Sequence, residues 1–337
     1  MKTIFLVKNG KANSSFEIRE TSIPVPKANQ VLIKSEAFGL NFADVMARLG
    51  IYRDAPPIPS VLGYEVVGRI ENFGSEVKNF KKGERVVAFT RFGAYAQYAV
   101  TDYRAAVSIP ENMDAGIATA LATQYCTAWF CAEEMINLRE GNNVLINAAA
   151  GGVGIALIQL AKRKDCTVYA NCGSDEKLSF LKNLGADFVF NYNKQDYFIE
   201  LKEKKIRIDV VFDSLGGKNF KKGYKLLTHG GRIVGYGAAE QVHSKKLFSS
   251  LSLLFGFGFY SPAFMLMQSK SIIGANMLRI ADSKPDVLQR CLQNVVELAI
   301  NGDIKPHVGA TFSADKIADA HQFLESRKSI GKIVVKW

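Results

Sequence analysis

The stretch Val144-Leu-Ile-Asn-Ala-Ala-Ala-Gly-Gly-Val-Gly154, followed by Ile155-Ala-Leu-Ile-Gln-Leu-Ala161, decides how the rest of the chain is interpreted. An apolar run typical of a strand enters a turn of small residues, and the turn opens directly into a segment with helical spacing of apolar residues. Aligned with Gly-x-Gly-x-x-Gly, the three key positions are Ala149, Gly151 and Gly154. The middle glycine would let the backbone approach a pyrophosphate, and the last would let the helix pack closely on the strand. The stretch predicts a nucleotide-binding turn; a tight turn without a ligand is the alternative.

Strand-like and helix-like patterns alternate from about residue 127 onward. Strands are predicted at 144–147, 167–171, 188–190, 208–213, 232–235 and 271–274, and helices at 153–164, 175–184, 196–204 and 219–227. This alternation is typical of a parallel sheet covered by helices on both faces. The fold class is therefore predicted to be α/β, with a doubly wound Rossmann sheet around the glycine turn.

The two ends of the chain have a different pattern. Residues 1–123 show strands and turns with little long helix, and strands are predicted at 31–38, 66–70 and 84–89. Three prolines exclude helix and central strand from 54–59, which is expected to be a loop. Near the other end, helices are predicted at 286–300 and 315–326 and a strand at 332–336.

Composition describes an ordinary globular protein with a basic surface. The 337 residues are 48% hydrophobic and 22% charged, with a formal net charge of +11. No run of five basic residues and no basic motif with interleaved aromatic residues is present, so nucleic acid is not an expected partner. The five cysteines are scattered and form no C-x-x-C pair, which favours free thiols. The apolar run at the amino terminus is too short for a signal peptide, so a cytoplasmic location is expected.

Three separated motifs carry a family resemblance. They are Phe38-Gly-Leu-Asn-Phe-Ala-Asp-Val-Met-Ala-Arg-Leu-Gly-Ile-Tyr52, Leu62-Gly-Tyr-Glu-Val-Val-Gly68 and the turn at 148–154, in this order. With them the chain resembles the medium-chain dehydrogenase/reductase superfamily, and within it the zinc-free quinone oxidoreductases such as zeta-crystallin. The segments 39–48 and 302–307 are especially similar to the vesicle amine transport protein branch.

The resemblance implies a domain organisation. A mainly β, GroES-like catalytic domain would be formed by residues 1–123 and 275–337, with the Rossmann domain at 124–274 between them. It also implies a homodimer.

A catalytic zinc site is not expected. Where the zinc alcohol dehydrogenases of this superfamily place cysteine and histidine ligands, this chain has Asn41 and Tyr64. Zinc needs three sulfur, imidazole or carboxylate ligands and an open position. The four histidines fall late in the chain and at no metal-ligand spacing, so surface or capping roles are expected for them: His229, His243, His307 and His321.

The residues after the second Rossmann strand favour NADPH over NADH. An NAD site places an acid about twenty residues beyond the glycine turn, where it binds the ribose 2′-hydroxyl. Counting from Gly151 reaches Asn171, and no acid precedes Asp175. Ser174 and Lys177 can supply a hydroxyl and an ammonium group to a 2′-phosphate, and the resemblance adds Tyr192 as a third contact. A helix cap is the alternative role for Ser174.

The reaction would be hydride transfer to an acceptor that gains negative charge and a proton, and without zinc that charge needs hydrogen-bond donors. Tyr52 is the candidate donor, because the resemblance implies a tyrosine at this place, and Tyr64 competes with it. The resemblance further implies that Asn41 and Asp44 position the nicotinamide ribose and the substrate. Thr127 is expected to begin the helix beneath the nicotinamide.

The other candidate cofactor contacts lie in the glycine turn and after later strands. In the turn, the backbone amides of the helix start are expected to bind phosphate: Gly152, Val153 and Gly154. At the carboxyl edge of the sheet, where open α/β folds bind ligands, four residues are candidates: Ser214, Gly235, Tyr236 and Asn276.

Residues 247–267 form an unusually apolar stretch. Glycines, a proline and four serines interrupt it, and it lies between two strands of one sheet, so a transmembrane helix is not expected. The stretch is expected to be an apolar lid over the substrate cleft that also allows peripheral membrane contact, with Lys245 and Lys246 facing an anionic surface.

The predicted function is an NADPH-dependent, zinc-independent quinone oxidoreductase acting on an apolar conjugated carbonyl. An enoyl or alkenal reductase is the first alternative, since it has the same cofactor and almost the same site. A membrane-associated carrier or adaptor that retains the NADPH-binding fold is the second.

Overall fold

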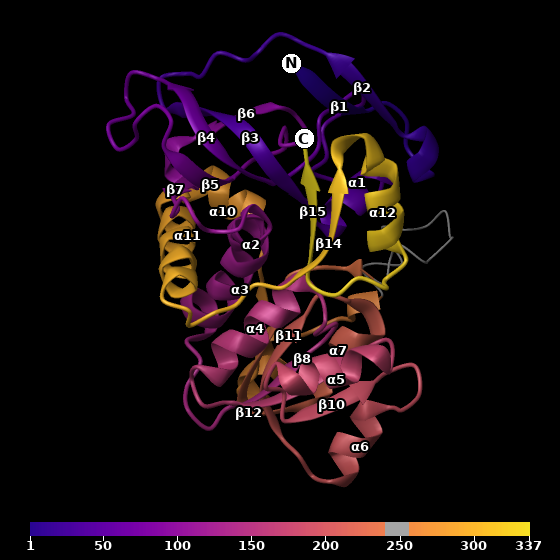
Figure 1. Ribbon diagram of the computed structural model, residues 1–337. Coiled ribbons are helices and arrows are strands. Elements are labelled where there is room, and N and C mark those ends of the chain that lie inside the picture. The colour runs from indigo at the N-terminus through magenta and orange to yellow at the C-terminus, as the bar shows by residue number, and fades with distance from the viewer. Residues whose placement is uncertain (240–255) are drawn as a thin grey trace. The chain divides into compact units, whose positions relative to one another are not determined.

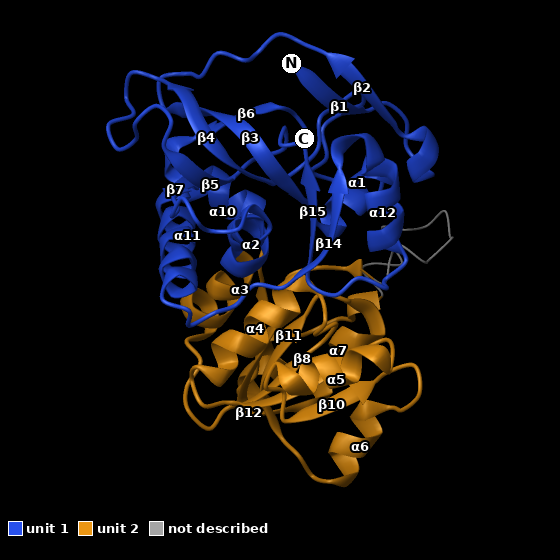
Figure 2. Cartoon of the chain, viewed as in Figure 1, with its two compact units in different colours: residues 1–126, 277–337 blue, residues 127–276 orange. Residues whose placement is uncertain are grey.

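The protein has two compact units in the computed structural model, which describes residues 1–239 and 256–337 (Figure 2). Unit 1 contains residues 1–126 and 277–337, and unit 2 contains residues 127–276. The chain thus leaves unit 1, forms unit 2 and returns. The sequence prediction put the two changes at 123/124 and 274/275.

Unit 2 is a doubly wound parallel sheet, as predicted (Figure 1). Its order is β10-β9-β8-β11-β12-β13, and all five neighbouring pairs are parallel. The strands are β8 (Asn143–Ile146), β9 (Thr167–Cys172), β10 (Phe188–Asn191), β11 (Ile208–Asp213), β12 (Leu227–Gly235) and β13 (Ser271–Gly274). The helices are α4 (Gly152–Lys162), α5 (Glu176–Asn183), α6 (Tyr197–Glu203), α7 (Gly217–Leu226) and α9 (Pro262–Gln268).

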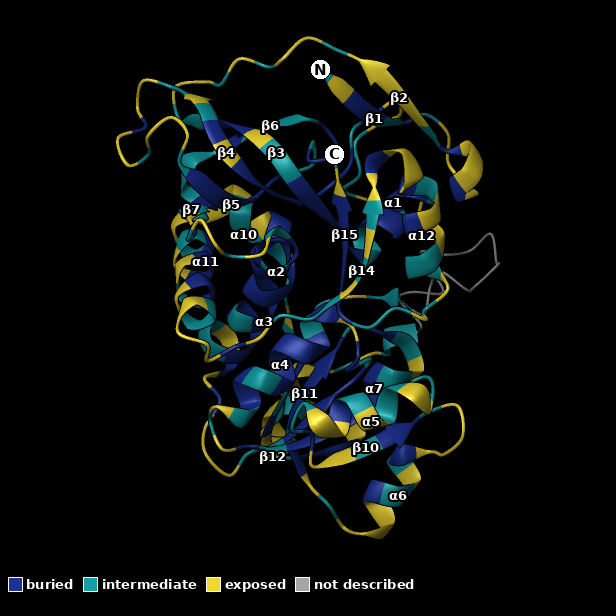
Figure 3. Ribbon diagram, viewed as in Figure 1, coloured by how far each residue is buried: buried dark blue, intermediate teal, exposed yellow. Residues whose placement is uncertain are grey.

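Continuous apolar runs form the central strands of this sheet because both of its faces are covered. Val144, Leu145 and Ile146 of β8 are wholly buried, and so are Val210 and Val211 of β11 (Figure 3). The strand order reverses direction at β8, because the chain moves from β8 to β9 and β10 on one side and later to β11, β12 and β13 on the other. Such a switch point is where open α/β sheets bind their ligands.

Unit 1 is mainly β, as predicted. A seven-stranded sheet runs in the order β14-β15-β3-β4-β5-β7, with β6 paired to β3, and a separate two-stranded sheet joins β1 to β2. The strands are β1 (Lys2–Leu6), β2 (Phe16–Glu20), β3 (Gln30–Leu40), β4 (Glu65–Phe73), β5 (Arg85–Phe89), β6 (Tyr98–Asp102), β7 (Ala106–Ser108), β14 (Val308–Ser313) and β15 (Lys332–Lys336). The helices are α1 (Phe42–Arg48), α2 (Ala115–Ala120), α10 (Met277–Ser283), α11 (Pro285–Ile300) and α12 (Ile317–Glu325).

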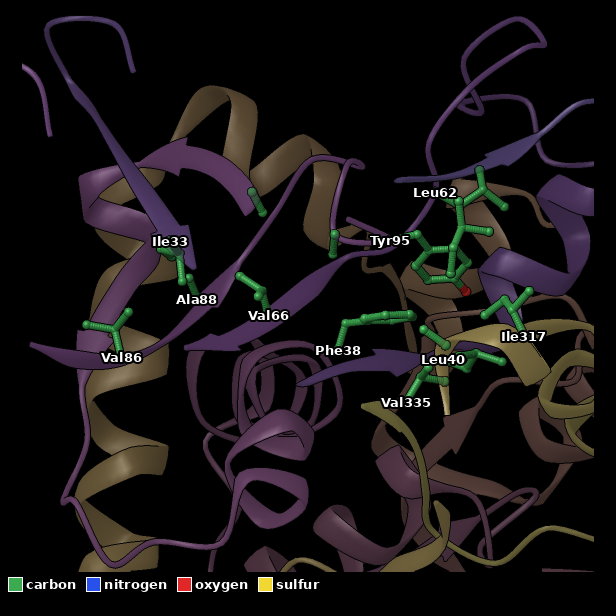
Figure 4. Packing of buried hydrophobic residues seen from close by; sticks show 14 of the residues in the cluster. Ile33, Phe38, Leu40, Leu62, Val66, Val86, Ala88, Tyr95, Ile317 and Val335 are labelled. Carbon is green, nitrogen blue, oxygen red and sulfur yellow. The ribbon is translucent and has the colours of Figure 1, made fainter. Parts of the chain in front are cut away.

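The core of unit 1 joins segments from both ends of the chain. Phe38 and Leu40 of β3 pack in one cluster with Val335 of β15 and Ile317 of α12 (Figure 4). All four side chains are buried. Because β15 lies between β14 and β3, the sheet of unit 1 is complete only when the carboxyl-terminal segment is in place.

Two helical segments begin before residue 123, where little long helix was predicted; the first is short and the second is long. Helix α1 begins after Asn41, where the Asp44 carboxylate accepts a hydrogen bond from the Asn41 amide 2.8 Å away. The second segment runs from α2 through two π-type turns (Leu121–Tyr125 and Phe130–Ile136) with α3 (Cys126–Trp129) between them. Thr127 therefore lies inside a helical segment, and the prediction that it begins a helix is wrong. The earlier start has a signal that the prediction did not use: the Asp114 side chain caps α2 by accepting from the Ile117 amide at 3.0 Å.

The first part of the apolar stretch predicted to be a lid, residues 247–255, lies outside the described residues. The rest leads into α9 and exposes apolar side chains: Phe259 is 80% exposed, Leu266 81% and Met267 77%. On its inner side, Phe257 and Tyr260 contact Phe220 of α7. Among the residues that the structure describes, no helix is both long and apolar enough to cross a membrane. The roles as lid and as membrane contact stay predictions.

Candidate active site

In the glycine turn between β8 and α4, some backbone amides form hydrogen bonds within the fold and others do not. Ala148 takes the left-handed conformation, with φ of 53°, and the Gly151 amide donates to its carbonyl oxygen at 3.0 Å. Ile155 donates to the Gly151 carbonyl oxygen at 2.9 Å. The amides of Gly152, Val153 and Gly154 consequently have no partner within the helix and form its positive end. These are the three amides predicted from the sequence to bind phosphate.

Ala149 has a different place from its neighbours in the turn. Its side chain is wholly buried, and its amide donates to the Asn171 carbonyl oxygen at 2.8 Å. The Ala149 amide is thus used by the fold. This residue can shape a phosphate site, but its amide is not available to phosphate without breaking that bond.

The two glycines of the turn differ in the space around them. A Cβ added to Gly154 would lie 2.5 Å from the Ala149 carbonyl oxygen and 2.6 Å from its Cα, so helix and turn could not keep their distance. A Cβ on Gly151 would meet only the Ala148 carbonyl oxygen, at 3.4 Å, which is ordinary contact. Gly151 is exposed. The close contact at Gly154 fits the packing role predicted for the last glycine. The exposed position of Gly151 fits the access role predicted for the middle one.

The structure brings together the three predicted 2′-phosphate contacts at the end of β9. A Cβ on Gly173 would lie 2.7 Å from the Tyr192 hydroxyl, so this phenol lies directly against the backbone that leads into Ser174. Asn193 holds the same loop by donating to the Gly173 carbonyl oxygen at 2.7 Å. Lys177 is half-buried, and that burial lowers its pKa. A hydroxyl, a phenol and an ammonium group therefore border one loop.

The first acid of this loop is engaged elsewhere. Asp175 accepts a hydrogen bond from Asn191 at 2.6 Å and forms an ion pair with Lys194. These contacts, the one with Lys194 first, lower the pKa of Asp175. Its carboxylate is therefore ionised but directed toward the neighbouring loop, which leaves Ser174 without a competing free acid.

The remaining candidate cofactor residues gather at the carboxyl edge of β11, β12 and β13. The Tyr236 amide donates to the Asp213 carbonyl oxygen, and the Ala239 amide to that of Ser214, both at 3.0 Å. Burial raises the pKa of Tyr236, so its phenol keeps its proton. The Ala275 amide donates to the Gly235 carbonyl oxygen at 3.0 Å and brings the exposed Asn276 to the same edge.

In unit 1, Asn41 belongs to a buried polar cluster that the sequence only partly predicted. Its Nδ2 donates to both carboxylate oxygens of Glu65, at 2.9 and 2.8 Å, and its Oδ1 accepts from Lys332 Nζ at 3.1 Å. Lys332 also forms an ion pair with Glu65, and both side chains are 0% exposed. Thr123 donates to the same carboxylate. The Asn41 side chain is thus held in one orientation, with its nitrogen toward the carboxylate and its oxygen toward the ammonium group.

Glu65 and Lys332 were missed as site residues. Glu65 follows Tyr64 in the motif at 62–68, and a buried glutamate needs a cation beside it. Lys332 opens a short apolar strand, where a lysine is usually solvated, so nothing in the sequence marks it as the partner. The pair also depends on Gly39, because a Cβ there would lie 2.2 Å from Lys332 Cε.

Asp44 is wholly buried beside this cluster. Its Oδ2 accepts from the Asn41 amide and its Oδ1 from the Gly63 amide at 3.1 Å. Burial, and then the charge of Glu65, raise its pKa to about 8, although both hydrogen bonds and Lys332 act in the opposite direction. At neutral pH this residue is largely a neutral acid, so it serves the site as a hydrogen-bonding group and not as a fixed negative charge.

We expect Asp44 to make the protein less stable as pH rises. Its pKa is about 8 in the folded protein and 3.8 in the unfolded chain, so the stability it provides is complete below pH about 4 and is lost as pH rises toward 8. Relative to an Asp44→Asn variant, wild type should lose about 1.4 kcal/mol of unfolding free energy per pH unit between pH 5 and 7. Urea denaturation of both proteins at several pH values measures this, and a constant difference would contradict the raised pKa.

Two tyrosines lie next to one another near this cluster. The rings of Tyr52 and Tyr64 meet edge to face, with centroids 6.4 Å apart. Tyr64 is 3% exposed, and burial, followed by the charge of Asp44, raises its pKa. Tyr52 is half-buried, and burial followed by the charge of Asp54 raises its pKa. Both phenols therefore carry their protons at neutral pH, and Tyr52 is the one that reaches solvent.

Asn41 and Tyr64, which the sequence resemblance aligns with zinc-ligand positions, have side chains that do not suit zinc. Asn41 directs its nitrogen to Glu65, and Tyr64 is a protonated phenol. Within the described ranges, no group of three histidine, cysteine or acidic side chains is arranged to hold a metal ion. One expectation about the histidines is wrong: His321 is 0% exposed, with Nε2 3.2 Å from the Tyr95 hydroxyl, because α12 turns it into the core.

The fold and these clusters define a class: a dinucleotide-binding Rossmann unit combined with a GroES-like catalytic unit. Sequence families agree, since residues 27–111 match the alcohol dehydrogenase GroES-like domain and residues 184–335 match the family described as zinc-binding dehydrogenase. The human synaptic vesicle membrane protein VAT-1 homolog is 32% identical over 94% of this chain and 81% of its own length. The rat quinone oxidoreductase is 30% identical over 93% of this chain and 91% of its own.

Solved structures give the same result. The human VAT-1 homolog-like protein superposes with a TM-score of 0.86 at 27% identity, over 100% of this chain and 98% of its own. The Escherichia coli quinone oxidoreductase, crystallised with NADPH, has a TM-score of 0.86 at 25% identity and full coverage of both chains. The chain belongs to the medium-chain dehydrogenase/reductase superfamily, in the family that contains the VAT-1 homologues and the quinone oxidoreductases.

Proposed function

We propose that this protein is an NADPH-dependent quinone oxidoreductase that works without zinc. The observation that carries the proposal is the half-buried, protonated phenol of Tyr52, whose ring meets that of Tyr64 edge to face. A quinone that accepts a hydride gains negative charge on oxygen, and a phenol is suited to meet that charge and supply a proton. The relatives named quinone oxidoreductase support this choice of acceptor.

NADPH fits the residues of unit 2. The turn offers the amides of Gly152, Val153 and Gly154 to a pyrophosphate, and exposed Gly151 leaves the approach open. Ser174, Lys177 and Tyr192 border the loop after β9, where a 2′-phosphate needs hydrogen-bond donors and positive charge. When bound, NADPH supplies the hydride, which carries both electrons to the acceptor.

The residues of unit 1 have separate tasks in this proposal. Tyr52 donates a proton to the reduced oxygen and recovers one from solvent, so one hydride and one proton convert quinone to hydroquinone. The Asn41 side chain is fixed by Glu65 and Lys332, and its oxygen retains acceptor capacity for a ribose or substrate hydroxyl. Asp44 holds the start of α1 and the Gly63 loop, and its largely neutral carboxyl leaves the site free of a second negative charge.

The experiment is NADPH and NADH oxidation, in chelator, against ortho-quinones, para-quinones and enals. Wild type should turn over quinones with NADPH. Tyr52→Phe should lower kcat about 100-fold, within the range usual for loss of a positioned acid, with little change in NADPH affinity. Tyr64→Phe is the matched control for loss of a phenol and should cost much less.

Other results would change the assigned function or the role of Tyr52. Preference for enals would move the assignment to enoyl or alkenal reduction. Tight NADPH binding without turnover of any acceptor would favour a carrier or adaptor. Unchanged turnover of Tyr52→Phe, or a larger loss in Tyr64→Phe, would remove Tyr52 from the proton-donor role.

A further inference from the structure

Three buried polar side chains form a chain beneath the glycine turn, which we name the turn-support chain: Asn171, Asn147 and Asp213. All three are 0% exposed. Asn171 Nδ2 donates to Asn147 Oδ1, and Asn147 Nδ2 donates to Asp213 Oδ2. They stand at the carboxyl ends of β9, β8 and β11, which are neighbours in the sheet.

Each end of the turn-support chain holds a different loop. Asn171 Oδ1 accepts from the Ala148 amide at 3.1 Å, and Ala148 is the left-handed residue of the glycine turn. At the other end, Asp213 Oδ1 accepts from the Gly216 amide in the loop after β11. Two loops that carry candidate cofactor residues are therefore fixed to one another through three side chains.

The direction of these hydrogen bonds is set by the Asp213 carboxyl group. Asp213 accepts at both oxygens, from the Gly216 amide and from Asn147, so Asn147 directs its nitrogen toward Asp213 and its oxygen toward Asn171. Asn171 must then present its nitrogen to Asn147, which leaves its oxygen for Ala148. A buried chain of this kind tolerates no reversed member, because one reversal would place two acceptors or two donors face to face.

This geometry changes the meaning of position 171. By its distance from the glycine turn, it is the place where an acid would select NAD, but its side chain points into the protein. We propose that Asn171 is a positioning residue that holds the phosphate-binding turn through the turn-support chain, and that the choice between NADPH and NADH is made outside it, by the loop at 173–177 and Tyr192. The proposal rests on cofactor binding alone and is independent of the acceptor.

The test uses the direction of the hydrogen bonds. Asn171→Asp places a carboxylate oxygen against Asn147 Oδ1, and Asp213→Asn replaces one of the two acceptor oxygens that fix the direction with a donor. In the double variant the chain can form again in reverse: the new carboxylate at position 171 accepts from Asn147 Nδ2, Asn147 Oδ1 accepts from the new amide at position 213, and both outer backbone contacts remain. Net charge is unchanged from wild type.

Fluorescence titration with NADPH and with NADH, without any acceptor, gives the readout. Each single variant should bind NADPH at least tenfold more weakly than wild type or fail to fold. The double variant should fold, bind NADPH within about threefold of wild type, and keep the wild-type ratio of NADPH to NADH affinity although it carries an acid at position 171. Ser174→Asp in the wild-type background should shift that ratio at least tenfold toward NADH.

Three results would overturn the proposal. The first is a double variant that fails to fold or binds as weakly as the two losses combined, because the chain would then have no direction to restore. The second is a double variant shifted tenfold toward NADH, since position 171 would then face the ribose. The third is an unchanged ratio in Ser174→Asp. Failure of every quinone to react would leave these binding results unaffected.

Discussion

Lys332→Met is expected to lower the free energy of unfolding by about 3–5 kcal/mol, because it leaves the Glu65 carboxylate buried without its cation. Both side chains are wholly buried, so water cannot compensate for the loss. Asn41 also loses the donor that holds its oxygen. Urea denaturation measures the change in stability.

The matched control is the neutral double variant Lys332→Met/Glu65→Gln. It removes both charges, keeps the amide close in shape to the carboxyl, and should recover most of the stability lost in the single variant. Recovery of stability with a lowered kcat would separate the structural role of the pair from its role in orienting Asn41. A loss below about 1 kcal/mol in the single variant would contradict a buried, uncompensated carboxylate.

Gly154→Ala should lower stability more than the same substitution at any other glycine that the structure describes in unit 2. The new Cβ would lie 2.5 Å from the Ala149 carbonyl oxygen, so α4 must move away from the turn. Overpacking of this kind costs about 1–3 kcal/mol, and the displaced turn should also lower NADPH affinity at least tenfold. Thermal unfolding and NADPH titration measure the two effects.

Gly151→Ala is the control for this prediction. Its φ of −76° suits alanine, and its Cβ would make only an ordinary contact at 3.4 Å. Stability should stay within about 1 kcal/mol of wild type, while NADPH affinity falls because the methyl group stands where the pyrophosphate approaches. Equal loss of stability in both variants would show that the turn does not pack as described.

Periodicity predicted the Rossmann unit well because its elements depend on local patterns. The strand and helix of the glycine turn were placed within two residues of β8 and α4. The segment 115–136 was not predicted, because its π-type turns have no simple apolar period. The left-handed turn residue is Ala148 and not a glycine, since hydrogen bonds from the surrounding fold hold it there.

Some candidate site residues could likewise be predicted from the local sequence, and others could not. Tyr52, Asn41 and Asp44 were predicted because the motif that contains them resembles that of related enzymes, and the structure places Asp44 and Asn41 in direct contact. Lys332 could not be found, since it comes from a strand almost three hundred residues later. The inward direction of Asn171 also escaped prediction, because counting along a sequence gives a position but no side-chain direction.

The place of β15 in the sheet of unit 1 bears on how the protein is made. On the ribosome, residues 1–126 emerge long before the strand that must lie between β14 and β3, and Glu65 has no cation until Lys332 arrives. Unit 2 is continuous in sequence and can fold as soon as it is synthesised, since domains generally fold as units during synthesis. The carboxyl-terminal segment therefore contains the strand that completes the sheet begun by residues 1–126. A nascent chain stalled within unit 2 would expose an open edge of β3 to chaperones.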